Sequence, residues 1–337
     1  MAGATSRTSA ARDAFAVIVG IGRYRDSQIR QLKYACDDAK ALRDTLVDPD
    51  LGGFPEKNVR LLLDEQASLR DLKSVIGKWL FQQARPESTV VIFFAGHGGL
   101  EPDKENRERD GMAKYLLPWD AERDDLFSTG LCDVEFQRLL GAVRSQSVVV
   151  FLDACYAAGV TAYGSRNIGI VEDVHARIAQ GQGRLVIASA EPNQQSWEDD
   201  GLRHGIFTYH LLQALRGEGE CDENGCVSVG EVFRHLQRCV PDSARLLCNS
   251  NQQPVFRGEE AKSIILTLVP EAHRHAAARQ EEHPPAVSAM ARSPAGPTSP
   301  ANNVPDQPAA SGRFCIACGK PVTAQQRFCR GCGRALG

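Results

Sequence analysis

Five short apolar runs, separated by amphipathic segments, limit what this chain can fold into more than any other feature. The runs are AFAVIVGI at 14–21, VRLLL at 59–63, TVVIFFA at 89–95, SVVVFLDA at 147–154 and RLVIASA at 184–190. Runs of this length and composition are typical of parallel strands buried on both faces of a sheet. Between them, apolar residues recur with helical spacing at 37–46, 69–82, 134–143 and 207–215. The alternation predicts a doubly wound α/β domain with a mostly parallel sheet.

The composition changes beyond the last of these segments. Residues 270–312 are rich in Ala, Pro and Ser and contain few large apolar side chains, so they cannot bury enough surface to fold alone. A cysteine-rich segment follows them. We therefore predict four parts, which are a flexible N-terminus at 1–13, a large domain at 14–269, a linker at 270–312 and a small unit at 313–337.

The net charge and the first residues narrow the class of protein. A formal net charge of -3 over 337 residues gives no global reason to expect nucleic acid or an anionic membrane as a partner. The N-terminus lacks the apolar core of an export signal, and no run approaches the ~18 apolar residues of a membrane span. We therefore expect a cytoplasmic protein whose cysteines are free thiols, metal ligands or a nucleophile rather than disulfides.

Two of the predicted strands end in residues that can carry out chemistry. VVIFFAGHGG places His97 just beyond one strand, and VVVFLDACYAAG places Cys155 just beyond another. Because ligands bind beyond the carboxyl ends of such strands, both residues should lie at the same edge of the sheet. An imidazole can take the proton of a thiol and return it to a leaving amine, and the backbone N–H groups of Gly98 and Cys155 are natural oxyanion donors. Either residue alone would more often be structural, but the two together predict a catalytic dyad.

The same motifs resemble those of the caspase-like peptidases. In that family a histidine within a pattern similar to FFAGHGG precedes the cysteine by about 50 residues. The resemblance covers about residues 14–269 and implies a caspase-like three-layer sandwich with cysteine endopeptidase activity. DACYAAG departs from the caspase pattern at Asp153 and Tyr156 and is more similar to the metacaspases.

This resemblance also implies a substrate preference. Caspases cleave after Asp and bind it in a basic pocket, whereas metacaspases cleave after Arg or Lys and use an acidic pocket. Asp153 matches the metacaspase residue that faces the basic side chain, and Asp38 in LKYACDDAKAL matches the acidic residue that completes the pocket. Ser196 and Glu198 in SWEDD align with a caspase Ser-Trp-Arg segment whose Arg binds the substrate Asp, and Glu198 in the Arg position inverts the charge offered to the substrate. We therefore expect protein substrates with exposed Arg or Lys, although Asp38 is equally explained as a favourable acidic residue in a first helical turn.

Caspase-like enzymes are commonly processed after the strand that bears the cysteine, which implies a zymogen and an upstream activating protease. Arg166 and Arg177 are the candidate processing sites, and an uncleaved insertion loop is the open alternative. By the same resemblance, a bacterial cell-suicide or antiviral defence module is the expected setting. Two rival functions stay open, which are a catalytically silent interaction protein and a nucleic-acid-associated factor.

Calcium is the first of two metals to consider. Metacaspases often hold it near the strand bearing the cysteine, and here only Asp133 matches, with Asp110, Asp120, Asp124 and Asp125 nearby. Separately, the segment 220–231 has the order of an EF-hand loop, with candidate ligands at Glu220, Asp222, Asn224, Cys226, Ser228 and Glu231. A turn followed by a helix cap formed by Ser228 and Glu231 explains most of this pattern equally well.

Zinc is predicted at the C-terminus. Cys315 and Cys318 form one CxxC pair, and Cys329 and Cys332 form a second. Four thiolates suit tetrahedral zinc, and a redox dithiol pair is the alternative. The segment resembles the small zinc ribbons at the ends of many bacterial proteins, whose roles vary, and docking to a protein partner is the interpretation we prefer. Its basic residues without acidic ones also permit contact with nucleic acid.

Overall fold

The computed structural model describes residues 13–105, 108, 110–154, 160–161, 174–181, 183–191, 194–258 and 264–271, and two short strands at 313–314 and 321–322. The chain divides into two compact units, residues 1–285 and 286–337. In the second unit, β15 (Arg313–Phe314) pairs antiparallel with β16 (Pro321–Val322). The four cysteines predicted to bind zinc lie outside the described residues.

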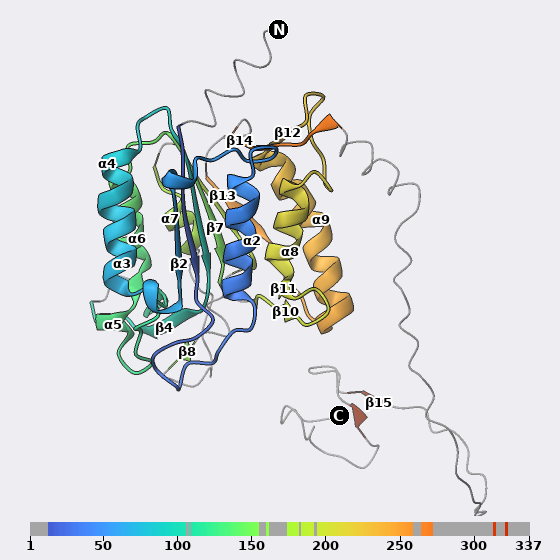
Figure 1. Cartoon of the computed structure of the whole chain (residues 1–337). Coiled ribbons are helices and arrows are strands. Elements are labelled where there is room, and N and C mark those ends of the chain that lie inside the picture. Colours follow the sequence, from blue (N-terminus) through green and yellow to red (C-terminus); the bar gives the residue numbers. More distant parts are fainter. Residues whose placement is uncertain are drawn as a thin grey trace, which may run out of the picture. The chain divides into compact units, whose positions relative to one another are not determined.

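A six-stranded sheet forms the centre of the first unit (Figure 1). Its strands, in spatial order, are β13 (Val255–Arg257), β9 (Arg184–Ala188), β7 (Ser147–Asp153), β3 (Thr89–Ala95), β1 (Ala14–Gly20) and β2 (Val59–Leu63). The five strands from β9 to β2 run parallel, and β13 runs antiparallel to β9. These five parallel strands are the five apolar runs, so the predicted α/β fold with a mostly parallel sheet is confirmed.

Helices cover both faces of the sheet because alternate residues of each strand face opposite sides. On β1, Val17 and Val19 belong to one hydrophobic core, whereas Ala16 and Ile18 belong to the other. The first core is covered by α3 (Leu69–Ser74), the π-helix η3 (Val75–Leu80), α4 (Phe81–Gln83), α6 (Asp133–Ala142) and α7 (Val174–Ile178). The second is covered by α2 (Ala35–Val47), α8 (Ile206–Leu215) and α9 (Val229–Cys248). The result is the three-layer sandwich visible in Figure 1.

The helix predicted over 69–82 forms but is not α-helical throughout. It changes to π-type hydrogen bonding over Val75–Leu80. Gly77 lies in this stretch, and a Cβ atom there would come within 2.6 Å of Leu139 on α6. The missing side chain therefore allows α6 to approach closely, a contact that helical periodicity alone does not reveal.

Short elements that the hydrophobic pattern did not predict surround the central sheet. A second, four-stranded sheet has the order β6 (Leu131–Cys132), β5 (Met112–Leu116), β4 (Gly98–Pro102) and β8 (Val160–Thr161). The remaining pairs are β10 (Glu198–Asp199) with β11 (His204–Gly205) and β12 (Cys226–Ser228) with β14 (Ile265–Leu268). Single-turn helices occur at η1 (Glu56–Asn58), η2 (Asp64–Gln66) and α5 (Leu126–Thr129). Strands this short carry too few residues for alternation to be recognised.

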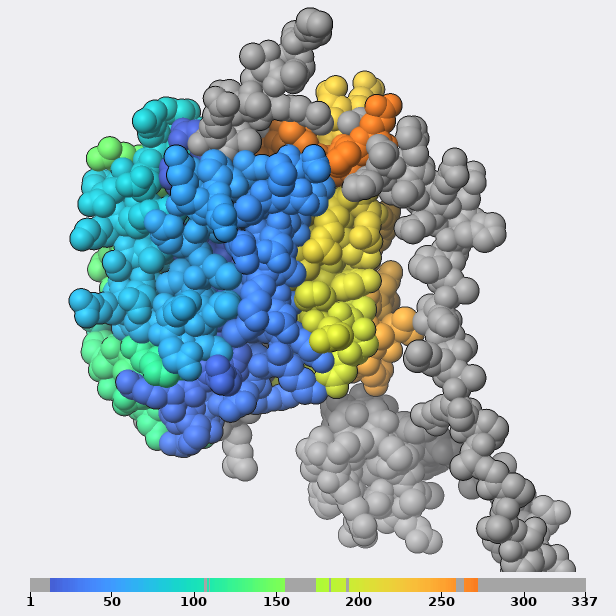
Figure 2. All heavy atoms as spheres, in the orientation of Figure 1, coloured from blue at the N-terminus to red at the C-terminus, as the bar shows by residue number. Residues whose placement is uncertain are grey.

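Figure 2 shows α2 and α8 side by side at the surface of one face, above the second core. Within the part of the chain that the structure describes, no helix is both long enough and apolar enough to span a bilayer. Six cysteines of the described residues, Cys36, Cys132, Cys221, Cys226, Cys239 and Cys248, are free thiols.

Candidate active site

The strands that precede His97 and Cys155 are neighbours in the sheet. β3 and β7 pair in parallel so that their last residues, Ala95 and Asp153, are register partners. The N–H of Gly96 donates to the carbonyl oxygen of Asp153 at 3.2 Å, which ties the two strand ends together. His97 and Cys155 each follow two residues beyond this paired position. Cys155 itself lies outside the described residues.

The ring of His97 is held by its neighbours in one orientation. Its Nε2 lies 2.6 Å from the carbonyl oxygen of Arg30, and its backbone N–H donates to Oη of Tyr24 at 2.7 Å. Because a carbonyl oxygen only accepts, Nε2 carries the proton and the neutral ring keeps its lone pair on Nδ1. Burial lowers the pKa of His97 below its ordinary value, more than the hydrogen bond to Arg30 raises it. The side chain is therefore a neutral base at ordinary pH.

Two glycines shape the turn on either side of this histidine. A Cβ atom on Gly96 would come within 3.0 Å of Oη of Tyr24, the group that holds the His97 backbone. On the other side, the N–H of Leu117 donates to the carbonyl oxygen of His97 at 3.0 Å. This bond makes Gly98 and its register partner Leu116 a non-hydrogen-bonded pair. The N–H of Gly98 therefore points away from β5, as an oxyanion donor would have to.

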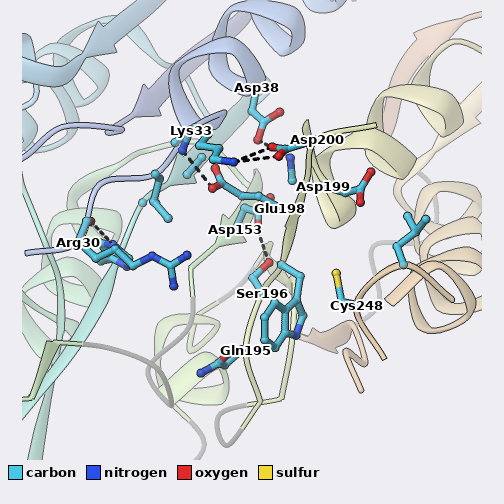
Figure 3. Close-up of a pocket in the computed structure, with 18 residues that line it drawn as sticks. Arg30, Lys33, Asp38, Asp153, Gln195, Ser196, Glu198, Asp199, Asp200 and Cys248 are labelled. Carbon is cyan, nitrogen blue, oxygen red and sulfur yellow. Dashed lines mark hydrogen bonds and ion pairs between the residues drawn. The ribbon is translucent and has the colours of Figure 1, made fainter. Parts of the chain in front are cut away.

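A cavity of about 590 Å³ opens beside His97 and brings together residues that are far apart in the sequence. Asp38 reaches it from α2, Asp153 from the end of β7, and Ser196 and Glu198 from the segment that leads into β10. Figure 3 shows the acidic side chains converging on this space. The structure thus places every predicted substrate-binding residue in one pocket next to the predicted base.

Asp38 and Asp153, which we call the acid pair, lie on either side of Gly205. Asp38 is 2% exposed, and its Oδ1 lies 2.5 Å from Nδ1 of His204 while its Oδ2 accepts from the N–H of Gly205 at 3.0 Å. A Cβ atom on Gly205 would come within 2.9 Å of Asp153 Oδ2 and 3.1 Å of Asp38 Oδ2. Only a glycine at this position lets both carboxylates approach the same point of the backbone.

Hydroxyl groups hold the second member of the acid pair. Asp153 accepts from Oγ of Ser196 and from Oγ1 of Thr208, each at 2.6 Å. In the described residues, no lysine or arginine pairs with either carboxylate. The acid pair is therefore positioned by hydrogen bonds but lacks a permanent cationic partner.

The electrostatics of the acid pair follow from this arrangement. Burial raises the pKa of Asp38 to about 7, and the charge of Asp153 acts in the same direction against the opposing hydrogen bond from His204. Burial likewise raises the pKa of Asp153, which the hydroxyls of Ser196 and Thr208 offset only in part. Both carboxyl groups would be stabilised in their charged form by a cation entering the pocket.

Glu198 lines the same pocket but has different partners. Its Oε2 accepts from the N–H of Lys33 at 3.0 Å and its Oε1 from the N–H of Tyr34 at 2.8 Å, at the start of α2. The ammonium group of Lys33 instead contacts Asp200 at 2.8 Å. Glu198 therefore contributes negative charge to the pocket while both of its oxygens already accept from backbone groups.

Several residues of this site carry no signal in the sequence. His204 lies in β11 and Thr208 in the first turn of α8. They contact the acid pair because β11 and α8 pack against α2, and because Thr208 reaches Asp153 at the end of β7. The Arg30 carbonyl and Tyr24 hydroxyl orient His97 from a loop distant in sequence. Single polar residues of this kind become recognisable only when the contacts are known.

The two candidate processing sites have different positions. Arg166 lies outside the described residues. Arg177 lies in α7, where Nη1 contacts Asp133 Oδ2 at 2.8 Å and Nη2 contacts Glu108 Oε2 at 2.8 Å. A helical backbone and an ion-paired side chain do not favour cleavage after Arg177, because peptidases bind their substrates extended.

Arg177 belongs to a larger group, which we call the ion-pair cluster. Its members are Glu108, Asp110, Asp133, Lys114 and Arg177. The ammonium group of Lys114, which is completely buried, contacts Glu108 at 3.0 Å and Asp110 at 2.8 Å. Two acids considered as metacaspase-like calcium ligands, Asp110 and Asp133, are thus paired with side-chain cations.

The predicted EF-hand-like segment forms a turn and a helix cap. The carboxylate of Asp222 accepts from the N–H groups of Asn224 and Cys226, and Glu220 pairs with Arg234 at 2.8 Å. Ser228 and Glu231 form a capping box at the start of α9. This arrangement favours the turn-and-cap alternative, because the carboxylates are directed to the backbone and to Arg234.

Comparisons with known proteins agree on the family. The family model for the caspase domain matches residues 13–264. Metacaspase-1A of Aspergillus oryzae is 25% identical over 184 residues, which cover 52% of this chain and 42% of that protein. Metacaspase-1 of Eremothecium gossypii is 25% identical over 150 residues, which cover 42% of this chain and 31% of that protein.

A solved structure shares the fold. The crystal structure of protein GSU0716 from Geobacter sulfurreducens superposes with a TM-score of 0.52 at 20% sequence identity and covers 77% of this chain and 100% of that chain. The chain spans less than half the length of the two metacaspases. The caspase-domain match, in contrast, extends over most of the chain and includes the positions of His97 and Cys155. This chain therefore belongs to the caspase-domain family of cysteine peptidases.

Proposed function

We propose that this protein is a cysteine endopeptidase that cleaves proteins after Arg or Lys. The observation that carries the substrate preference is the acid pair, two buried carboxyl groups with raised pKa values and no lysine or arginine partner among the described residues. His97 lines the same cavity. A substrate whose basic side chain is bound there therefore has its scissile peptide bond next to His97, the catalytic base.

In the proposed reaction, His97 Nδ1 takes the proton of the Cys155 thiol. The thiolate attacks the scissile carbonyl carbon, and the resulting oxyanion accepts hydrogen bonds from the N–H groups of Gly98 and Cys155. When the C–N bond breaks, His97 returns the proton to the leaving amine and a thioester remains on Cys155. Water, deprotonated by His97, then hydrolyses the thioester and restores the thiol.

The preference for a cation follows from the desolvation of the acid pair. An isolated carboxylate loses hydration when buried, and an oppositely charged partner within hydrogen-bonding distance compensates for that loss. A substrate guanidinium or ammonium group supplies such a partner to Asp38 and Asp153. A substrate carboxylate adds a third negative charge to the same space and is repelled, which excludes the caspase preference for Asp.

Processing and docking complete the proposal. We propose that the zymogen is cut before α7, with Arg166 as the site, because Arg177 is held in the ion-pair cluster. The C-terminal cysteines are proposed to bind structural zinc and to dock a protein partner, with nucleic acid as the alternative. We also propose a cytoplasmic setting and, from the family resemblance, a role in a bacterial cell-suicide or antiviral defence module.

A peptide panel tests the proposal directly. Fluorogenic peptides that are identical except for Arg, Lys, Asp or Leu at the cleaved position are incubated with wild type and with Cys155→Ala. We expect Arg and Lys peptides to be cut at least about 100-fold faster than the Asp peptide, and Cys155→Ala to cut none. Faster cleavage of the Asp peptide would contradict the pocket assignment, and activity in Cys155→Ala would contradict the nucleophile.

A further inference from the structure

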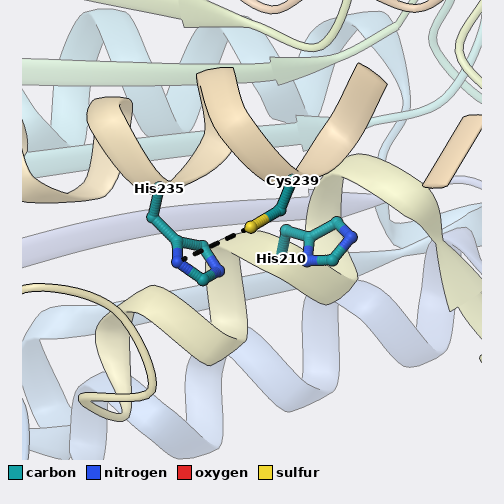
Figure 4. Close-up of side chains that lie close together, drawn as sticks. All are labelled: His210, His235 and Cys239. Carbon is teal, nitrogen blue, oxygen red and sulfur yellow. Dashed lines mark hydrogen bonds between the residues drawn. The ribbon is translucent and has the colours of Figure 1, made fainter. Parts of the chain in front are cut away.

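A group of metal-ligating side chains lies between α8 and α9, away from the acid pair. His210 comes from α8, and His235 and Cys239 come from α9, where a spacing of four residues places them on one face. One ligand atom from each residue lies within 4.8 Å of the other two. Figure 4 shows the three side chains close together between the two helices.

One nitrogen in this group lacks a partner. Nε2 of His235 is buried and has no hydrogen bond within the described part of the chain. Its other nitrogen, Nδ1, lies 4.0 Å from Sγ of Cys239, at the limit of a sulfur hydrogen bond. Buried polar atoms in native proteins are nearly always satisfied. An orphaned nitrogen on a ring whose centroid lies 5.8 Å from that of His210 therefore indicates a missing ligand.

The tautomer of His210 is set by a chain of hydrogen bonds that ends in the same space. The carboxylate of Glu218 only accepts, so Gln213 donates its amide N–H to it at 2.9 Å and turns its carbonyl oxygen toward His210. That oxygen lies 2.7 Å from Nδ1 of His210, which must therefore carry the proton. Nε2 keeps the lone pair and accepts from the hydroxyl of Ser243 at 2.8 Å. Outer groups commonly orient metal-binding histidines in this way.

The burial of the proposed ligands suits a site that an ion can reach. Both histidines are buried, whereas Cys239 and Ser243 are half-buried, which leaves an ion a route from solvent.

We propose that Nε2 of His210, Nε2 of His235 and Sγ of Cys239 bind a zinc ion between α8 and α9, with water as the fourth ligand. Two imidazoles and one thiolate form a ligand set suited to a borderline metal, and three protein ligands leave one tetrahedral position open. Binding releases the thiol proton of Cys239 to solvent, and the metal replaces the Ser243 hydroxyl at His210. The site would join α8 to α9.

The test separates this site from the C-terminal cysteines. The full chain is prepared with Cys155→Ala, to prevent self-cleavage, and with all four C-terminal cysteines changed to Ser. Cobalt is the probe, because thiolate ligation adds a charge-transfer band to its spectrum. We expect one cobalt ion per chain with this band, and displacement by zinc.

Further substitutions in this background assign the ligands. Cys239→Ser should abolish the charge-transfer band and His235→Gln should weaken binding, whereas Cys248→Ser, a matched change on the same helix, should leave the spectrum unchanged. Gln213→Leu removes the hydrogen bond that orients Nδ1 of His210 but keeps all three proposed ligands. It should weaken cobalt binding roughly 10- to 100-fold. Absence of cobalt binding, or a charge-transfer band that persists in Cys239→Ser, would overturn the proposal.

A measurement without substitutions near the site guards against misfolded variants. Alkylation of Cys239 in the same background is followed by peptide mass spectrometry, with and without zinc. We expect zinc to slow the modification of Cys239 at least about tenfold and to leave that of Cys248 unchanged. Equal alkylation of Cys239 in the two conditions would also contradict the site.

Discussion

The protein buries two groups of acidic residues. Within the described part of the chain, one group is paired with lysine and arginine side chains, and the other is not. In the ion-pair cluster, Lys114 and Arg177 contact the carboxylates directly. Burial alone would raise the pKa of Glu108, but these two cations hold it below its ordinary value. Asp133 shows the limit of this compensation, because its deeper burial raises its pKa despite the contact with Arg177.

In the acid pair, only hydroxyls, a backbone N–H and His204 contact the carboxyl groups in the described part of the chain, and both pKa values are raised. The difference separates two uses of buried charge. A group with its own cations joins segments of the fold. One without them is, under the proposed function, available to bind a cation from the substrate.

The largest expected effect concerns stability in the ion-pair cluster. Lys114→Met leaves Glu108 and Asp110 buried without their ammonium partner and should lower the free energy of unfolding by about 3–5 kcal/mol. Urea denaturation of Cys155→Ala chains measures it. Lys40→Met, which removes an exposed ion pair with Asp37, is the control and should cost less than about 1 kcal/mol. Equal losses in the two variants would show that the cluster does not stabilise the fold.

The next effect concerns activity at the acid pair. Asp153→Asn should reduce kcat/KM for Arg peptides about 100-fold, because the substrate cation loses a buried charged partner. The free energy of unfolding should not fall, because the free enzyme no longer buries this unpaired charge. Asp37→Asn makes the same change in charge on the exposed side of α2 and should alter kcat/KM less than twofold. A parallel loss of stability and activity in Asp153→Asn would give this residue a structural role instead.

The pH dependence gives a third, smaller effect. Asp38 must be ionised to pair with a cation, and its pKa is raised to about 7, so kcat/KM for Arg peptides should rise about tenfold as pH increases through this value. His97 has a pKa below its ordinary value, so its own inflection lies at lower pH. Asp38→Asn should remove only the upper inflection. If that inflection persists in the variant, it belongs to another group.

The same shift predicts how stability changes with pH. A carboxyl group whose folded pKa is raised binds protons more tightly when folded, so its contribution to stability is largest in acid. That contribution is lost as pH rises from the unfolded value of about 3.9 through the folded value of about 7. Thermal melting of Asp38→Asn against wild type should therefore show a gain in stability above neutral pH that disappears in acid.

The smallest effect is expected at Glu198. Its two oxygens already accept from the N–H groups of Lys33 and Tyr34, and Gln keeps one acceptor oxygen in the same place. Glu198→Gln should reduce kcat/KM for Arg peptides by about threefold to fivefold, mostly through the lost charge. A loss as large as that of Asp153→Asn would show that Glu198 pairs with the substrate directly.

The main elements and the position of the base could be predicted from the sequence because both depend on local pattern. Continuous apolar runs identify buried parallel strands, and the residues that follow them must lie at the carboxyl edge of the sheet. The short strands β4, β5, β10 and β11 were missed, because two to five residues give no usable alternation. The π-type segment at Val75–Leu80 was missed because it has the same apolar spacing as the α-helix on either side of it.

The sequence by itself determined that His97 lies two residues beyond the strand at 89–95 and that Cys155 lies two residues beyond the strand at 147–153. Both positions follow from hydrophobicity and chain order, which are properties of neighbouring residues. The sequence also offered more acidic candidates than one pocket can use. Only the tertiary structure decided that Asp38 and Asp153 meet at Gly205 with no lysine or arginine beside them in the described part of the chain, while Asp133 meets Arg177. Whether a buried charge is neutralised depends on distances between residues far apart in the chain, and folding alone sets those distances.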